Sequence, residues 1–176
     1  SLEDSAQPLA NPLSRDMGML RTSLLPGLLR TASANLRHQQ SRLKLFETGH
    51  DFSAGRQWSE SERLGLLIGG SAHPESWLGE RRDFDFYDLK GEIEHLLGCL
   101  GHRPDSMQAA AKSVPFLHTG QSCAFTLNDR ELGLAGQLHP ALTADLDLGT
   151  TVLIAELDLG VLRQRTLPEF SGTARF

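Results

Sequence analysis

The side chains best suited to binding a metal are two histidines and a cysteine that lie close together in the sequence. His95, Cys99 and His102 are spaced i, i+4 and i+7, so they share one face of a predicted helix, and their types suit zinc. However, Gly101 is expected to end that helix before His102, and no fourth ligand lies nearby. Structural zinc sites use four closely spaced ligands. We therefore predict a solvated polar face and no metal site.

A second group could serve nucleophilic catalysis. His118, Ser122 and His139 supply the side-chain types of a nucleophile and a base, although the chain has no G-x-S-x-G elbow. Such partners are neighbours in space rather than in sequence, so composition alone does not exclude them. The simplest interpretation of residues 118–122 is a turn that leads into a strand. An enzyme with a pocket around these three residues is one alternative.

Two adjacent glycines, Gly69 and Gly70, follow an apolar run and could suggest a phosphate-binding loop. A P-loop requires Lys followed by Ser or Thr after its last glycine, and a dinucleotide fingerprint requires three spaced glycines before a helix. Neither pattern occurs here. We interpret these glycines as the exit from a strand.

A long amphipathic helix is predicted over residues 23–40. Ser23 can cap it, and Pro26 falls in the first turn, where a missing N–H costs little. Apolar residues recur at helical spacing and form one stripe: Leu24, Leu25, Leu28, Leu29, Ala32 and Leu36. Such a stripe packs on the helix's own sheet or is shared with a partner subunit.

Alternation and apolar runs predict the strands. Residues 42–47 alternate, residues 63–70 and 151–157 are continuous apolar runs, and Gly49 and Gly55 bracket a turn region. Asn128 and Asp129 form a good hairpin turn between strands at 123–127 and 131–138.

A second helix is predicted over residues 88–101, capped by Asp88. Short helices are predicted after His139 and Asp158. The tally is five or six strands with two substantial and two short helices. We predict an α+β fold in which helices flank an antiparallel sheet. Its core should bury the following residues: Leu45, Leu66, Ile68, Leu96, Leu127, Leu138, Val152 and Ile154.

Composition limits the class of protein and its expected cellular location. The 176 residues suit one core, and the net charge of −5 argues against broad adhesion to nucleic acid. No apolar run approaches the ~18–20 residues that span a bilayer, so no membrane association is expected. The two cysteines are too few for a disulfide framework, which favours a reducing cytoplasm. No signal-peptide pattern is present, so a cytoplasmic protein is expected. The first residue is not Met, so we expect the chain to begin either after processing or within a longer protein.

Six collinear segments carry a resemblance to a known family. They are NPLSRDMGMLRTSLLPGLL, RLKLFETGHDF, RLGLLIGG, DFDFYDLKGEIEHLL, FLHTGQSCAFTLNDRELGLAGQLHPAL and TVLIAELDLGVL. In this order they resemble the catalytic-core-like domain of the bacterial phenylalanyl-tRNA synthetase beta subunits, across nearly the whole chain. The resemblance implies a class II synthetase-like core. Independently of the resemblance, Pro8 and Pro12 predict an irregular lead-in at 1–20. The last residues show no packing pattern, so we expect a core at 21–165 followed by a linker at 166–176.

The resemblance further implies a domain that does no chemistry. The second class II signature is an aromatic-Arg-x-Glu strand, and aligned on Glu47 the arginine position is Leu45. The third signature, a glycine-rich segment that ends in Arg, is missing. Adenylate formation uses such arginines to hold ATP phosphates. We therefore expect no catalytic residue and no cofactor in this chain, whereas the whole enzyme of the family charges tRNA with phenylalanine using ATP and magnesium.

The partner implied by the resemblance is the synthetase alpha subunit, in an α2β2 heterotetramer that also binds tRNA. The first helix would serve subunit association, with part of its stripe exposed in the isolated chain. The expected interface residues are Leu20, Arg21, Leu24, Leu25, Leu28 and Leu29. The other alternative is a free-standing protein- or RNA-binding module with the same fold.

Overall fold

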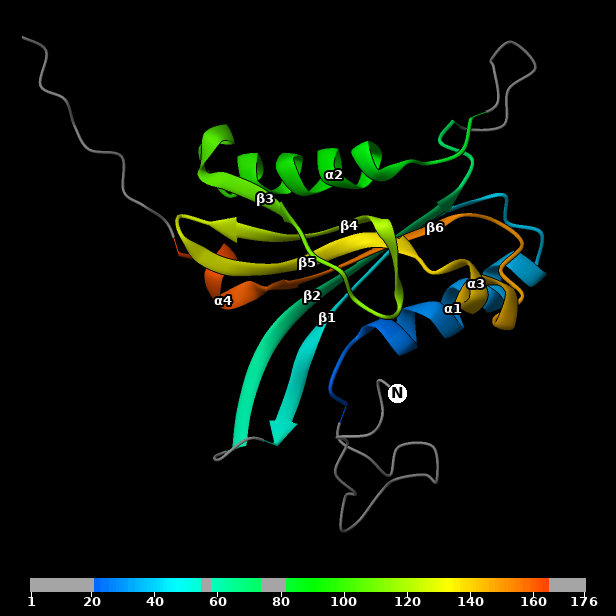
Figure 1. The fold of residues 1–176 in the computed structure, drawn as a ribbon, viewed down its shortest axis with the longest axis horizontal. Coiled ribbons are helices and arrows are strands. Elements are labelled where there is room, and N and C mark those ends of the chain that lie inside the picture. The colour runs from blue at the N-terminus through cyan, green and yellow to red at the C-terminus, as the bar shows by residue number, and fades with distance from the viewer. Residues whose placement is uncertain (1–20, 55–57, 74–81, 165–176) are drawn as a thin grey trace, which may run out of the picture.

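One six-stranded antiparallel sheet organises the chain (Figure 1). The structure is a computed structural model that describes residues 21–54, 58–73 and 82–164. The strand order is β1-β2-β6-β5-β4-β3, and every neighbouring pair is antiparallel. The strands are β1 (Arg42–Ala54), β2 (Trp58–Gly70), β3 (Met107–Ala111), β4 (Leu117–Leu127), β5 (Arg130–Leu138) and β6 (Val152–Asp158). The predicted α+β class with an antiparallel sheet is confirmed.

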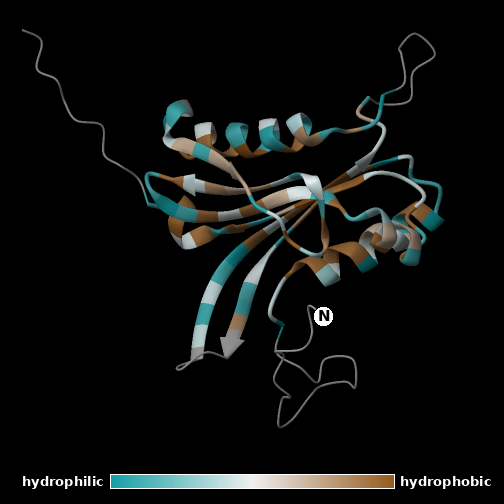
Figure 2. Cartoon of the chain, viewed as in Figure 1, coloured by the Kyte–Doolittle hydropathy of each residue, from teal (hydrophilic) through white to brown (hydrophobic). Residues whose placement is uncertain are grey.

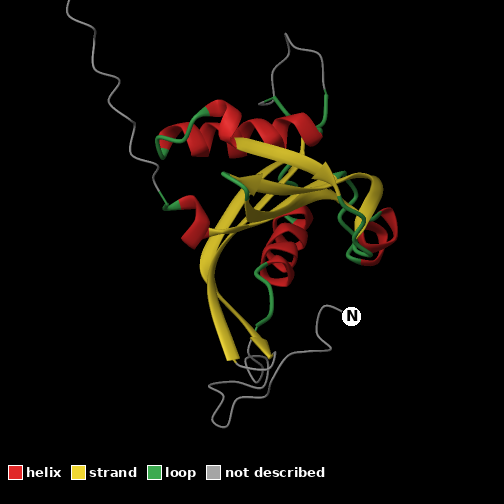
Figure 3. Cartoon of the chain, turned by 60° about the vertical axis from the view of Figure 1, so that its left-hand side comes forward, coloured by secondary structure: helices red, strands yellow, loops and turns green. Residues whose placement is uncertain are grey.

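Helices lie on both faces of the sheet (Figure 3). They are α1 (Leu25–Arg37), α2 (Phe86–Cys99), α3 (Pro140–Asp145) and α4 (Leu159–Leu162), together with a short 3-10 turn, η2 (Pro104–Ser106). One apolar cluster joins α2 to the sheet, and a second cluster joins α1 to the opposite face. Figure 2 shows that α2 turns its apolar side to the sheet and its polar side outward. The two faces therefore form separate cores.

Both long helices differ from their predicted bounds by a few residues. The first helix begins at Leu25 and ends at Arg37 rather than spanning 23–40, because Gln39 adopts a left-handed backbone with φ 61°. The second begins at Phe86, two residues earlier than predicted. Asp85 caps it, and Asp88 completes a capping box from inside the first turn. Asp88 is therefore part of the cap but not the N-cap.

The first hairpin is longer than predicted. Gly49, predicted to bracket a turn, lies inside β1 and pairs with Arg63 in β2, so β1 and β2 are each 13 residues long. The distal half of each strand is mostly polar, so hydrophobic periodicity gave no sign that the two halves pair. Gly55, the other predicted bracket, lies outside the described residues.

The β4–β5 hairpin turn is confirmed. Asn128 and Asp129 have φ of 50° and 62°, and positive φ at both central residues is the type I′ geometry. Strand β3 was not predicted, because Gln108 to Ala111 are small or polar and exposed. The short helices begin where expected, with His139 and Asp158 as their N-caps.

Five of the eight predicted core residues are buried. Ile68, Leu127, Leu138, Val152 and Ile154 are each at most 4% exposed. The remaining three are only partly buried, and they pack on the rims of the clusters: Leu45, Leu66 and Leu96. The predicted lead-in (1–20) and linker (166–176) lie outside the described residues. None of the described helices is long and apolar enough to cross a membrane.

Candidate functional site

Polar groups from three elements meet at the point where α1 begins on the sheet. We call it the helix–sheet junction, formed by Arg21, Ser23 and Leu24 from the entry to α1, Glu47 from β1 and Glu156 from β6. The Arg21 carbonyl accepts a hydrogen bond from the Phe52 N–H at 2.9 Å, which fixes the incoming chain against β1. The junction therefore joins three elements that are distant in sequence.

One glycine lets α1 approach the sheet closely, and a second leaves room for the Arg21 side chain. A Cβ on Gly65 in β2 would lie 2.7 Å from Leu28 Cδ1 and 3.2 Å from Leu24 Cβ. A Cβ on Gly49 in β1 would lie 2.9 Å from the Arg21 Cζ. At Gly65 the crowding atoms belong to α1 and the residue that precedes it, so this position needs glycine for steric reasons rather than for backbone conformation. At Gly49 they belong to the flexible Arg21 side chain, which can move aside.

The Glu156 carboxylate anchors the start of α1. Its Oε1 accepts hydrogen bonds from the Ser23 hydroxyl at 2.9 Å and from the Leu24 N–H at 2.7 Å. The Ser23 Oγ in turn accepts from the Leu25 N–H at 3.1 Å. A helix N-terminus has unpaired N–H groups and positive potential, so a carboxylate there is favourable. Burial nevertheless raises the pKa of Glu156, while these hydrogen bonds and Arg63 oppose that rise and Asp51 adds to it.

This arrangement predicts that the difference in folding stability between wild type and Glu156→Gln depends on pH. Because the pKa of Glu156 is raised above its ordinary 4.5, the folded protein binds this proton at higher pH than the unfolded chain. Protonation of Glu156 therefore contributes stability that is fully present below pH 4.5 and is lost as the pH rises through the folded-state pKa. Urea unfolding should show wild type gaining stability relative to Glu156→Gln as the pH is lowered from neutral towards 4.5, the ordinary value.

The control for this experiment is Glu156→Ala. It removes the acceptor of both hydrogen bonds, so it should lose about 1–3 kcal/mol. That loss should grow as the pH falls, because only wild type gains stability from the proton on Glu156. Glutamine retains an acceptor oxygen and should lose less. Parallel pH profiles for wild type and Glu156→Gln would show that Glu156 does not titrate differently on folding.

Both arginines near the junction are neutralised by carboxylates. The Arg21 Nη1 lies 2.6 Å from the Glu47 Oε1, and its Nε donates to the His50 carbonyl at 2.8 Å. Arg63 lies 3.0 Å from Asp51 and 3.4 Å from Asp158. These charges therefore serve internal ion pairs, and the arrangement is suited to holding α1 in place rather than to binding an anion.

The three candidate zinc ligands do not converge. His95 and Cys99 are exposed neighbours on α2, with the Cys99 Sγ 3.7 Å from the His95 Nε2. His102 is buried, and its Nε2 lies 2.7 Å from the Leu162 carbonyl oxygen. Within the described ranges, no group of three or more His, Cys, Asp or Glu side chains is placed to hold a metal ion.

The three candidate catalytic residues are also separated. His118 accepts from the Gly120 N–H, Ser122 donates to the Lys112 carbonyl, and His139 accepts from the Ala141 N–H. Ser122 lines a cavity under α2, whereas His139 lines a groove beside α1. The alternative of one pocket around all three residues is therefore wrong. Gly69 and Gly70 end β2 as predicted.

Four leucines of the predicted interface are buried rather than exposed, whereas Leu36 of the same stripe is only partly buried. Leu24, Leu25, Leu28 and Leu29 are at most 8% exposed, and the last three pack into the apolar cluster between α1 and the sheet. Their exposure was overestimated because periodicity does not show how closely α1 approaches β2 at Gly65. Arg21 is half-exposed and paired with Glu47, while Leu20 lies outside the described residues.

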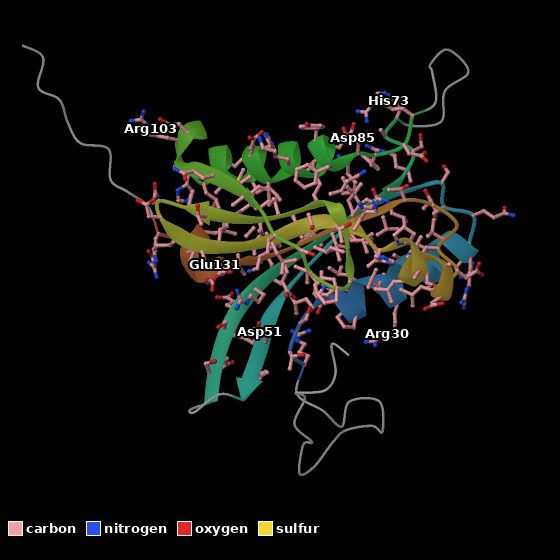
Figure 4. All side chains as sticks on the ribbon, in the orientation of Figure 1. Arg30, Asp51, His73, Asp85, Arg103 and Glu131 are labelled. Carbon is pink, nitrogen blue, oxygen red and sulfur yellow. The ribbon has the colours of Figure 1, made fainter. Side chains whose placement is uncertain are left out.

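An apolar groove of about 710 Å³ lies beside this stripe, between α1, α3 and the segment before β4. Arg30 from α1 and Asp145 from α3 are its exposed charged residues. Figure 4 shows Arg30 on the side of α1 that faces away from the sheet. The apolar lining comprises Pro26, Leu29, Pro115, Phe116, Ala141, Leu142 and Leu146.

Sequence reasoning missed Glu156 and the two junction glycines. A signal for Glu156 exists, since it is the one carboxylate inside the apolar run of residues 152–157. Its i+2 spacing from Ile154 assigns it to the face that meets α1. Gly49 and Gly65 carry no comparable signal, because glycine within a strand is equally compatible with a turn or a bulge.

A family model and curated relatives match this sequence. The family model described as the phenylalanyl tRNA synthetase beta chain CLM domain matches residues 2–159. The chain is 36% identical to the phenylalanine–tRNA ligase beta subunit of Hahella chejuensis, covering 99% of this chain and 22% of that protein. It is 38% identical to that of Nitrosospira multiformis, covering 96% and 21%. The chain thus spans about a fifth of the length of these relatives.

A solved structure shares the fold. It is PylSc, a pyrrolysyl tRNA synthetase from Desulfitobacterium hafniense, with a TM-score of 0.66 and 19% sequence identity. The match covers 92% of this chain and 53% of that chain. At this identity the likeness concerns the fold alone.

Proposed function

The chain belongs to the phenylalanyl-tRNA synthetase beta-chain family, as the sequence resemblance indicated, and has a class II synthetase-like fold. From this premise we propose that it is a non-catalytic scaffold domain of a phenylalanine–tRNA ligase beta subunit, acting in the cytoplasm. In this role it supports an α2β2 assembly that charges tRNA. The observation that carries the proposal is the helix–sheet junction, where Arg21 and the neighbouring Arg63 are both paired with carboxylates.

The junction residues do not fit a nucleoside triphosphate. Leu45, at the position aligned with the signature arginine, is apolar and packs against the α1-side cluster. Arg21 already pairs with Glu47, and the Glu156 carboxylate points at the start of α1. An ATP phosphate brought here would meet carboxylates rather than free guanidinium groups, and that arrangement repels anions. We assign ATP and magnesium to parts of the enzyme outside this chain.

We propose that the alpha subunit meets α1 at its outer edge, through the apolar groove. The four buried leucines of the stripe hold α1 on the sheet, while Arg21 and the part of Leu29 that lines the groove belong to the accessible side. The groove offers apolar surface between two oppositely charged residues, Arg30 and Asp145, a pattern typical of an interface centre with a polar rim. We further propose residues 21–165 as the core, 1–20 as a lead-in and 166–176 as a linker.

Catalytic silence is tested by phenylalanine-dependent ATP–pyrophosphate exchange. We expect the purified chain, supplied with ATP, magnesium and phenylalanine, to show no exchange above a protein-free blank. The complete α2β2 enzyme assayed in parallel is the positive control. The physical reason is the lack of a free arginine at the junction to stabilise charge on the transferring phosphate.

The decisive outcome depends on excluding contamination. The chain is therefore purified in two orthogonal steps and assayed after each, because the second step removes traces of whole enzyme. We expect exchange no higher than the protein-free blank after the second step. Exchange that persists in constant proportion to this chain would contradict the proposal.

A further inference from the structure

Strand β3 forms one edge of the sheet, directly alongside α2 (Figure 1). It pairs with β4, and within the described part of the chain no strand pairs with its outer side. We propose that β3 and the first turns of α2 form a peptide-binding groove. It would receive an extended segment of a partner protein as an additional strand. This surface lies on the α2 side of the sheet, apart from the helix–sheet junction.

Two hydrogen bonds define which main-chain groups of β3 face outward. The Lys112 N–H donates to the Ser122 carbonyl at 3.3 Å, and the Ser106 carbonyl accepts from the Asn128 N–H at 3.1 Å. In an antiparallel pair, successive residues direct their N–H and C=O groups alternately to either side. Residues 106, 108, 110 and 112 therefore face β4. The N–H and C=O groups of Ala109 and Ala111 consequently point to the free edge.

The β3 edge lacks the features that usually block strand addition. Natural edge strands are protected by proline, by bulges or by charged side chains. Gln108 to Ala111 are exposed, uncharged and mostly alanine, and β3 pairs with β4 without a bulge. The next residue, Lys112, lies 3.1 Å from Glu131 in β5, so its charge is drawn back over the sheet. An approaching backbone would thus meet small side chains.

A cavity of about 550 Å³ adjoins this edge under the first turns of α2. Phe86 and Tyr87 line it, and Tyr87 is 78% exposed. Lys90 also lines the cavity, and its ammonium group is paired with Glu94. Ala109 and Ala111 share the α2 face with their partners Phe125 and Cys123 in the buried cluster. A peptide residue opposite Ala109 or Ala111 would therefore direct its side chain towards this cavity.

These features specify a peptide with a large apolar side chain at the residue that faces the cavity. Main-chain hydrogen bonds would supply affinity and the cavity would supply specificity, as in known strand-addition sites. The net charge of −5 favours a segment with basic flanks. A second copy of the chain fits less well, because pairing through a five-residue strand buries far less than the ~1,200 Å² of a stable interface.

The test uses the 176-residue chain and a short capped peptide of about seven residues, which spans the edge. The probe alternates threonine with valine, carries phenylalanine at its centre and has lysine at both ends. We expect binding to slow hydrogen exchange at the Ala109 and Ala111 amides but not at Ala110, whose N–H already faces β4. A probe with alanine at the centre should bind more weakly.

Ala109→Pro is the decisive variant. It removes one outward N–H but no bond to β4, a position where an edge strand tolerates proline. Affinity for the probe should fall at least about tenfold while the melting temperature stays close to that of wild type. Gln108→Thr, which retains its N–H on the same strand, is the matched control and should bind normally.

Three results would overturn the proposal. The first is no probe binding by a folded wild-type chain, and the second is equal binding by Ala109→Pro. The third is self-association of the chain through the β3 edge, detected as a concentration-dependent sedimentation coefficient that Ala109→Pro abolishes, in the absence of probe binding.

Discussion

Gly133→Ala should lower the free energy of unfolding by about 3 kcal/mol or more, since a strained φ and overpacking each cost ~1–3 kcal/mol. Gly133 in β5 has φ +151°, a conformation that residues with a side chain rarely adopt. A Cβ there would lie 2.9 Å from the Leu157 Cα and closer still to the Glu156 carbonyl oxygen. Both neighbours are backbone atoms of β6, so no side chain can move aside. The damage would fall on the strand that carries the Glu156 anchor.

Gly91→Ala is the matched control for this prediction. Gly91 lies in the middle of α2, and a Cβ there would meet no atom within 4 Å apart from the neighbouring backbone of its own helix. Because alanine is the better helix former, this variant should gain up to about 1 kcal/mol. Urea unfolding of both variants compares the two glycines on one scale. Equal stabilities for the two variants would contradict the close packing of β5 on β6.

The sequence was most informative where one local signal determined one local structure. Asn128 and Asp129 predicted the β4–β5 turn, and the helix caps at His139 and Asp158 were recognisable from residue type. Prediction failed where pairing was decided by a distant partner. The distal half of β1 is polar and contains Gly49, yet β2 pairs with it throughout. Strand β3 is likewise defined by β4 rather than by its own residues.

In the candidate site, too, local features were predictable and contacts between distant residues were not. Periodicity correctly identified the apolar stripe of α1 but not what covers it, because burial depends on how closely α1 approaches β2 at Gly65. The Glu156 anchor is formed by residues more than a hundred positions apart in the chain, and local patterns carry no information about such contacts. A carboxylate inside an apolar strand was the available clue.

The second large effect is expected at the proposed alpha-subunit groove. Ala141 is exposed on α3 and lines the groove, so Ala141→Glu would place an unpaired carboxylate in an interface that excludes water. We expect the affinity for the alpha subunit to fall at least about a hundredfold, because burying an unpaired charge is costly. The fold should survive, since an acidic residue is favourable in the first turn of a helix.

Ala144→Glu provides the matched control. Ala144 is exposed on the same short helix but does not line the groove. The variant adds the same charge a few residues away, so it reports any effect of charge alone. Circular dichroism of both variants should match that of wild type.

The scaffold role is tested most directly by sedimentation velocity of this chain mixed with the alpha subunit of the same organism. The account predicts that wild type and Ala144→Glu each form a complex with the alpha subunit, whereas Ala141→Glu sediments as a separate species. A folded wild-type chain that forms no complex with the alpha subunit would contradict the scaffold role. Equal complex formation by Ala141→Glu would contradict the groove as its interface.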